Sequence, residues 1–143
     1  MTESEWRTRK NRVDRRLKDA GWRAVAFQVR EDLAPYGTAA VEEFETANGP
    51  ADSLLTDQGN PLAVVEAKKV SLSSQNALTQ AIRYSRGVAP SPFDFDGNHV
   101  PFGYSTNGEQ IYFQDLRRAE SYSRRVSRFH TPSALGEYLK RDE

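Results

Sequence analysis

Two acidic residues and one lysine in the middle of the chain are of types that suit phosphodiester hydrolysis. Asp52 immediately precedes one short apolar run, and Glu66 and Lys68 lie near the end of the next. Carboxylate oxygens suit Mg²⁺, which keeps several waters and bridges protein carboxylates to substrate phosphates. A metal held in this way stabilises charge on the phosphate and lowers the pKa of a bound water. The lysine could orient that water or neutralise the developing charge.

A hairpin over residues 51–69 would position these three side chains. Two short β-prone runs flank Asp57-Gln58-Gly59-Asn60-Pro61, a stretch of turn-forming residues. Such a stretch between two apolar runs is typical of a hairpin. Side chains alternate between faces along the second run, so Glu66 and Lys68 share one face.

Asp52 joins this face only if it lies opposite Glu66. That register puts Thr56 opposite Leu62 and leaves a five-residue loop, which keeps Pro61 and its missing N–H out of the ladder. On spacing alone, an alternative is a hairpin with a salt-bridged, solvated face. The second run is apolar on both faces, however, which predicts a covered central strand whose charges are paired, metal-bound or functional.

These residues resemble the PD-(D/E)xK nuclease signature, in the version found at the N-terminus of type I restriction enzyme R (HsdR) subunits. The matching segments run through nearly the whole chain: Glu5-Trp6-Arg7-Thr8-Arg9, Leu17 to Trp22, Gly49 to Asp52, Val64 to Lys69, Gln80 with Tyr84, Pro101 to Glu109, and Phe129 to Leu135. The chain departs from the family pattern at Ala51, which displaces Pro50 by one position. It departs again at Ser53, where the family usually carries an aromatic residue.

The resemblance implies a metal-dependent endodeoxyribonuclease domain of a type I restriction-modification R subunit, acting on double-stranded DNA. It implies an α/β fold, a restriction-endonuclease-like mixed β-sheet flanked by helices. Asp52, Glu66 and Lys68 would be catalytic, and Asp52, Glu66 and Ala67 would bind Mg²⁺ or Mn²⁺. Partners would be the motor region and the modification and specificity subunits of a restriction complex.

A helix predicted over residues 3–20 carries one more candidate acid. The resemblance matches Glu5, either as a third, catalytic carboxylate near the metal, held by Arg9, or as a favourable first-turn acid at the positive helix end. The polar face of this helix is strongly basic, with Arg7, Arg9, Lys10, Arg12, Arg15, Arg16 and Lys18. It is either a solvated face or a DNA-binding one, in which case Arg9, Arg12 and Arg16 contact phosphates.

A second helix is predicted from Ser73 or Ser74 to about Arg86, with Gln80 and Tyr84 on one face. In the resembled family this element lies next to the nuclease site and helps to hold DNA, so the resemblance implies that both residues bind substrate. A tyrosine packed on the core fits the spacing equally well.

The remaining segments are expected to be scaffold. Residues 22–29 alternate like a strand, whereas residues 38–45 favour a helix by propensity and a strand by the implied fold. Asn107-Gly108 predicts the turn of a hairpin. Residues 117–128 carry five arginines and form either a contact with DNA or a neighbouring domain, or a solvated linker. Thr131-Pro132 begins a last helix.

Length and composition predict one domain, residues 1–143, which ends about where the motor of the resembled enzymes begins. Its 20 basic and 20 acidic residues cancel, which argues against a protein that works by charge alone. The absence of cysteine excludes a disulfide framework and fits a reducing cytoplasm. No signal peptide or membrane-spanning run is evident.

The chain has no P-loop motif and is therefore not expected to bind ATP. Two alternative functions stay open at this level. One is a non-catalytic DNA-binding or docking module that keeps a nuclease fold. The other is a nuclease of another DNA-processing pathway, such as junction resolution or repair.

Overall fold

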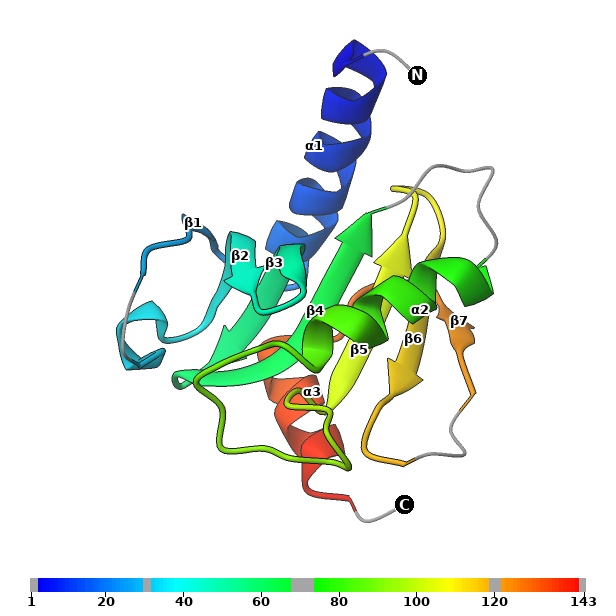
Figure 1. Ribbon diagram of the computed structural model, residues 1–143. Helices are drawn as coiled ribbons and strands as arrows, with labels where there is room; N and C mark the ends of the chain where they lie inside the picture. The colour runs from blue at the N-terminus through cyan, green and yellow to red at the C-terminus, as the bar shows by residue number, and fades with distance from the viewer. Residues whose placement is uncertain (1–2, 30–31, 68–73, 119–121, 142–143) are drawn as a thin grey trace.

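The computed structural model describes residues 3–29, 32–67, 74–118 and 122–141, and only the backbone of residues 3–9 and 74–78. Within them, seven strands form one mixed sheet with helices on both faces (Figure 1). The strands are β1 (Ala24–Ala26), β2 (Ala39–Thr46), β3 (Gly49–Asp57), β4 (Asn60–Ala67), β5 (Phe102–Thr106), β6 (Ile111–Asp115) and β7 (Arg124–Val126). The helices are α1 (Glu3–Asp19), α2 (Ser74–Ser85) and α3 (Pro132–Leu139), with a 3-10 turn, Ala34–Tyr36. The predicted fold class is confirmed.

The strands lie in the sheet in the order in which they occur in the chain. The β1–β2 and β4–β5 pairs are parallel and all other pairs are antiparallel. β4 is the central strand, and seven of its eight residues are buried. The prediction of a covered central strand is therefore confirmed.

Two apolar clusters cover the two faces of the sheet. On one face, α1 and α3 contribute Leu17 and Leu135 to a cluster that includes Val65 of β4. On the other face, Ala81 of α2 packs with Val64. Figure 1 shows α2 in front of the sheet and α1 behind it. No helix of the described residues has the length and apolar character of a membrane span.

The predicted five-residue loop between β3 and β4 is wrong. Asp57 pairs with Asn60, so the turn is Gln58-Gly59 alone, and Pro61 lies in the ladder opposite Thr56. Both turn residues have positive φ, 52° and 79°, the conformation of the two-residue turns that match strand twist. A register shift immediately before Thr56 accommodates the shorter turn.

The predictions for the other helices and strands are confirmed in part. The predicted helices match α1, α2 and α3, and the Thr131 hydroxyl caps α3 by accepting a hydrogen bond from the Ala134 N–H at 3.1 Å. The ambiguous segment 38–45 is strand β2. The strand expected over 22–29 shrinks to β1, because Trp22 is buried and its indole N–H donates to the His130 carbonyl at 2.8 Å.

The expectation of a solvated linker over residues 117–128 is wrong in part, because β7 pairs there with β6. Arg124 lies over the rings of Phe113 and Tyr138, with its guanidinium carbon 5.6 and 5.8 Å from the ring centroids. Cation–π contacts of this kind stabilise a strand that lacks apolar alternation.

His130 makes folding stability depend on pH. Its Nδ1 is hydrogen-bonded to the Tyr104 hydroxyl at 2.5 Å, and burial, together with the charge of Arg124, lowers the pKa of His130. The unfolded chain therefore binds a proton more readily than the folded chain. We expect the free energy of unfolding to be highest above about pH 6.5 and to fall as the pH drops below it.

Urea unfolding at pH 7.5 and pH 5.5 measures this effect. His130→Gln should show a smaller loss between the two pH values than the wild type. His99→Gln, at the only other histidine, is the matched control and should keep the wild-type loss. An equal loss in the wild type and His130→Gln would contradict the assignment.

Candidate functional site

Asp52 and Glu66 are joined across β3 and β4. Ser53 pairs with Val65, so the next step of the register brings Asp52 opposite Glu66. The Asp52 N–H donates to Glu66 Oε1 at 3.2 Å, and the Ala67 N–H donates to Asp52 Oδ2 at 2.7 Å. The register that the sequence predicts at this point is confirmed, and each carboxylate is oriented by the backbone of the other strand.

Glu66 lies in a covered environment. It is 2% exposed, and its neighbour on β5 is Ser105, also 2% exposed. A buried carboxylate is costly unless hydrogen bonds or a cation compensate it. Ser105 is a site neighbour that the sequence does not reveal, because the parallel β4–β5 pairing joins distant segments.

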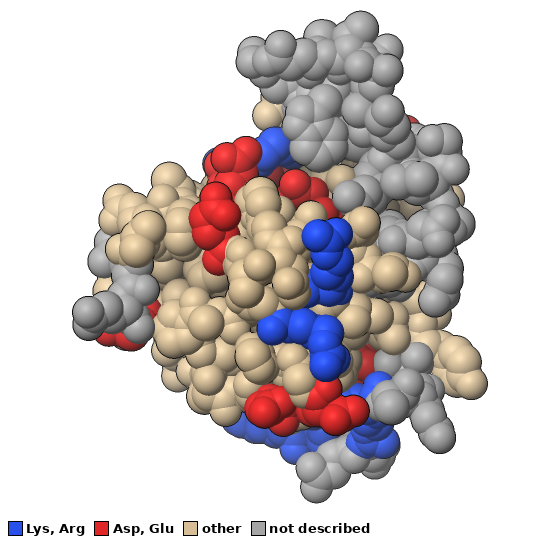
Figure 2. All heavy atoms as spheres, viewed as in Figure 1, with Lys and Arg blue, Asp and Glu red and all other residues tan. Residues whose placement is uncertain are grey.

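Asp52 is half-buried and borders a cavity of about 460 Å³. Three acids of β2 line the same cavity: Glu42, Glu43 and Glu45. Figure 2 shows acidic side chains gathered over the β2–β3 hairpin. The structure thus places the three β2 acids around one cavity with Asp52.

The pairing of β2 with β3 is interrupted opposite Asp52. Glu42 pairs with Ser53 and Phe44 with Ala51, but Glu43 between them has a φ of 52° and is absent from the ladder. Among the described residues, no three His, Cys, Asp or Glu side chains are grouped closely enough to form a metal cage. The β2 acids therefore give the cavity a negative lining without forming a further ligand set.

Gln80 and Tyr84 lie on α2, near the turn that precedes β3. Gly49 has a φ of 114°, which favours glycine, and a Cβ there would lie only 3.2 Å from Tyr84 Cε1. Gln80 Oε1 accepts a hydrogen bond from Arg83, which also donates to the Asn48 carbonyl, both at 3.3 Å. The element is thus held against the strand that carries Asp52. Tyr84 also packs on the core, as the alternative interpretation expects.

Arg12 and Arg16 lie on α1, across the sheet from α2. Arg12 is 3.5 Å from Glu109 Oε1, and both side chains are largely exposed. Arg16 borders a small cavity with Ser127 and Arg128. The alternation of β4 places Glu66 on the same face as Val64, the face that α2 covers, so these two cations do not adjoin the carboxylate pair.

The other predicted site residues lie outside what is described. Lys68 follows β4 directly but is not among the described residues, and the side chains of Glu5 and Arg9 are not described either. The backbone of Glu5 belongs to the first turns of α1. Figure 1 shows these turns extending beyond the sheet at the edge where β4 ends.

Comparisons with known proteins give consistent matches. A model of the family described as "Type I restriction enzyme EcoKI endonuclease subunit second domain" matches residues 34–139. The type I restriction enzyme EcoKI endonuclease subunit of Escherichia coli (strain K12) is 27% identical over 175 aligned residues, which cover 89% of this chain and 15% of that protein. The chain thus spans about 15% of the length of this curated relative.

A solved structure is similar over most of the chain. It is a fragment assigned as an HsdR subunit of a type I restriction enzyme from Vibrio vulnificus YJ016. The TM-score is 0.65 at 26% identity, over 94% of this chain and 25% of that one.

Proposed function

Because the chain belongs to the family of the type I restriction enzyme EcoKI endonuclease subunit second domain, we propose that it is the metal-dependent endodeoxyribonuclease domain of a type I restriction-modification R subunit. The observation that carries the proposal is the pair of reciprocal hydrogen bonds linking Asp52 with Glu66 and Ala67. They hold two carboxylates together at the end of a central strand, and Asp52 borders the adjoining cavity.

The residues of this pair fit Mg²⁺ or Mn²⁺. Asp52 uses Oδ2 to accept the Ala67 N–H, and none of the described residues donates a hydrogen bond to its Oδ1. Mg²⁺ needs only one or two carboxylates when waters and a substrate phosphate complete its shell. Asp52 and Glu66 would hold the ion, and Ala67 can add only its main-chain carbonyl. When bound, the metal would lower the pKa of a water and stabilise charge on the phosphate.

The side chains have separate tasks in this proposal. Glu66, being buried, fixes the position of the pair, and Asp52 presents its carboxylate to the cavity. Lys68 orients the attacking water or neutralises charge on the phosphate. Glu5 is proposed as a third carboxylate near the metal.

In this proposal, α1 and α2 bind the substrate. Gln80 and Tyr84 of α2 would hold double-stranded DNA, and Arg9, Arg12 and Arg16 of α1 would contact its phosphates. A motor region and the modification and specificity subunits of a restriction complex, in the cytoplasm, are the proposed partners. ATP would bind elsewhere in such a complex.

A plasmid nicking assay tests the proposed activity. The chain should convert supercoiled DNA to the open circle in the presence of Mg²⁺ and not with EDTA. Lys68→Ala should reduce the rate by at least about a hundredfold, because it removes a charge placed at the transition state. Lys69→Ala, one residue away, is the matched control. Equal rates for Lys68→Ala and the wild type would contradict the role given to Lys68.

One observation favours a non-catalytic docking module. Both carboxylates of the pair already accept backbone N–H groups, so each has a structural partner in the hairpin. A chain that binds DNA but cleaves no plasmid with Mg²⁺ or Mn²⁺ would support this second function.

The salt dependence of DNA binding tests the role of α1. The double variant Arg12→Gln/Arg16→Gln should flatten the log–log slope of affinity against salt by about two units, since each phosphate contact contributes about 0.9. Fluorescence anisotropy with a duplex oligonucleotide gives the slope. Lys140→Gln/Arg141→Gln, at the end of α3, removes the same charge and serves as the control. An unchanged slope in the α1 variant would leave these arginines on a solvated face.

A further inference from the structure

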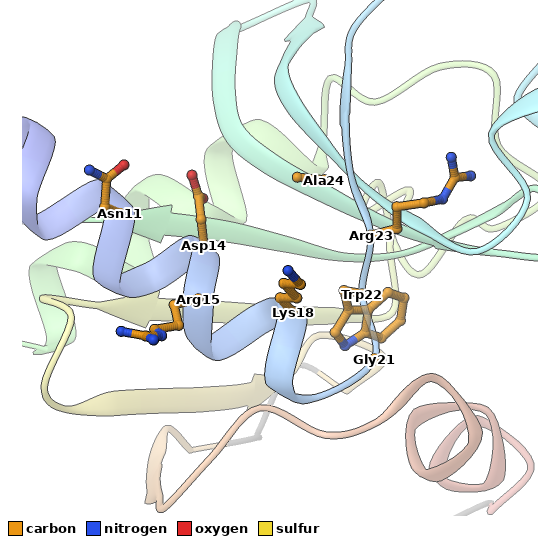
Figure 3. A pocket seen from close by; sticks show the side chains of 8 residues that line it. All are labelled: Asn11, Asp14, Arg15, Lys18, Gly21, Trp22, Arg23 and Ala24. Atoms are coloured by element: carbon orange, nitrogen blue, oxygen red, sulfur yellow. The ribbon is translucent and has the colours of Figure 1, made fainter.

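A groove beside β1 takes no part in the site described above. It has a volume of about 680 Å³ and lies between the last turns of α1 and the segment that enters β1 (Figure 3). Its lining residues, from Asn11 to Ala24, all precede residue 34, where the match to the family model begins. The proposed function uses other residues of α1 but assigns no role to the residues that line this groove.

The groove carries uncompensated positive charge. Arg15, Lys18 and Arg23 line it with exposed side chains, and among the described residues none of them has a carboxylate partner. The acid in the groove, Asp14, is already 3.4 Å from Lys10 Nζ. A surface of this kind attracts anions.

The three cations are spread along the groove. In Figure 3, Arg15 lies at one side, Lys18 in the middle and Arg23 at the far side, and their charged ends do not converge on one point. A single compact anion would meet only one of them. An extended anionic segment would meet all three.

The strand next to the groove has a free edge. β1 is the outermost strand of the sheet, and within the described part of the chain it pairs only with β2. Ala24 and Ala26 are exposed, and Val29 just beyond is 91% exposed. An open edge with apolar side chains presents N–H and C=O groups that another strand can pair with.

The usable length of this edge is short. The Tyr36 hydroxyl accepts from the Gln28 N–H at 2.9 Å and donates to the Gln28 carbonyl at 2.8 Å. Pairing by an added strand is therefore confined to the stretch before Gln28. The start of that stretch, Ala24, lines the groove.

We propose that this edge and groove bind an extended acidic segment of a partner polypeptide. The segment adds a strand to β1 and sets its carboxylates against Arg15, Lys18 and Arg23. Because residues two apart in a strand share a face, the segment alternates acidic and apolar residues. A nucleic-acid backbone would satisfy the cations, but its phosphates cannot form the alternating donor and acceptor ladder that the β1 edge offers. The proposal does not depend on the nuclease activity.

Peptide binding to the whole chain tests the charge contacts. The probe is a fluorescein-labelled peptide of alternating glutamate and valine, and fluorescence anisotropy should give saturable binding. The triple variant Arg15→Glu/Lys18→Glu/Arg23→Glu should weaken it by at least about tenfold, the effect of losing three exposed ion pairs. Arg118→Glu/Arg125→Glu/Arg128→Glu makes the same charge change at exposed arginines elsewhere and should bind like the wild type. Equal weakening in both triple variants would show that the peptide does not bind in this groove, and would overturn the proposal.

Backbone-modified peptides test the added strand. Two versions of the probe, N-methylated either at every valine or at every glutamate, keep the charges but lack the N–H groups of one strand edge. At least one of them should lose binding. If both bind like the unmodified peptide, strand addition is wrong.

Two further measurements distinguish other occupants of the groove. If the peptide fails to bind while a duplex oligonucleotide binds and is released by the groove variant, the occupant is a phosphate backbone and the proposal is overturned. If sedimentation shows a dimer of the chain that the groove variant dissociates, and the peptide does not compete, the occupant is a second copy and the proposal is likewise overturned. Circular dichroism of both triple variants confirms that the fold is intact.

Discussion

Asp52→Asn and Glu66→Gln are each expected to lower Mg²⁺-dependent plasmid cleavage by at least about a thousandfold. Each change removes one of the two carboxylates proposed to hold the metal, whose stabilisation of phosphate charge amounts to several kcal/mol. Binding of duplex DNA without metal should persist or tighten, because each variant removes a negative charge near the phosphate. The nicking assay and anisotropy without metal measure the two effects separately.

Glu45→Gln is the matched control for both variants. It removes one charge from the lining of the same cavity but leaves the hydrogen bonds between Asp52, Glu66 and Ala67 intact. It should cleave at close to the wild-type rate. Wild-type cleavage by Asp52→Asn or Glu66→Gln would show that the pair does not hold the metal. Loss of the circular dichroism signal in either variant would instead show that Asp52 and Glu66 are needed for folding.

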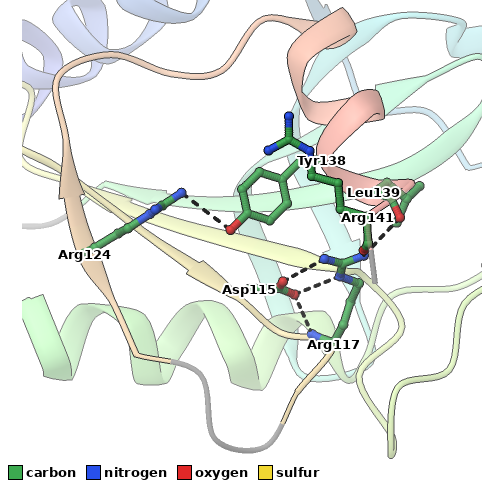
Figure 4. Close-up of polar contacts among 6 residues, drawn as sticks. All are labelled: Asp115, Arg117, Arg124, Tyr138, Leu139 and Arg141. Carbon is green, nitrogen blue, oxygen red and sulfur yellow. Dashed lines mark hydrogen bonds and ion pairs between the residues drawn. The ribbon is translucent and has the colours of Figure 1, made fainter. Parts of the chain in front are cut away.

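Asp115→Ala is expected to lower the free energy of unfolding by about 3–5 kcal/mol, the cost of leaving one member of a buried ion pair alone. The Arg117 guanidinium makes two hydrogen bonds with the Asp115 carboxylate, at 3.0 and 2.8 Å, and the Arg117 main-chain N–H donates a third at 3.0 Å (Figure 4). Both side chains are about 90% buried. The same guanidinium donates to the Leu139 and Arg141 carbonyls at 2.9 and 2.8 Å. It therefore satisfies groups that the end of α3 leaves unpaired.

Urea unfolding measures this loss. Arg117→Lys should also destabilise, because a lysine cannot reproduce the planar fork that bonds the carboxylate and two carbonyls at once. Glu137→Ala disrupts the exposed pair with Lys140, 3.5 Å apart, and should cost less than about 1 kcal/mol. A loss of that small size in Asp115→Ala would contradict a structural role for the buried pair.

The pairing of Asp52 with Glu66 was predictable from the sequence. Alternation along β4 puts Glu66 on one face, and Asp52 shares that face only if it lies opposite Glu66. With the observed two-residue turn, this register also depends on the shift before Thr56, which the sequence does not predict. The turn was not predictable from composition, because Gln58 adopts a positive φ that non-glycine residues seldom take. The packing of Gly59 against the 3-10 turn, where a Cβ would lie 2.7 Å from Ala34 Cα, explains the tight connection.

Features that depend on contacts between distant segments could not be predicted from the sequence. The acidic cavity beside Asp52 requires the parallel pairing of β1 with β2, which no local pattern specifies. β7 has two arginines among its three residues, so its sequence carries no apolar alternation. Trp22 begins an alternating, strand-like stretch, yet its indole N–H donates to the His130 carbonyl, more than a hundred residues away in the sequence.

The order of the connections also has a kinetic consequence. Ala47-Asn48 and Gln58-Gly59 are the only residues between β2, β3 and β4, so these strands form a meander of local contacts. The parallel pairing of β4 with β5 must first close the segment 68–101, and loop-closure entropy rises by about 0.6 kcal/mol for each doubling of loop length. Topology of this kind makes the local pairs form early and the parallel pairs late. The carboxylate pair therefore belongs to the part of the sheet expected to form first, and α2 joins it only as the β4–β5 crossover closes.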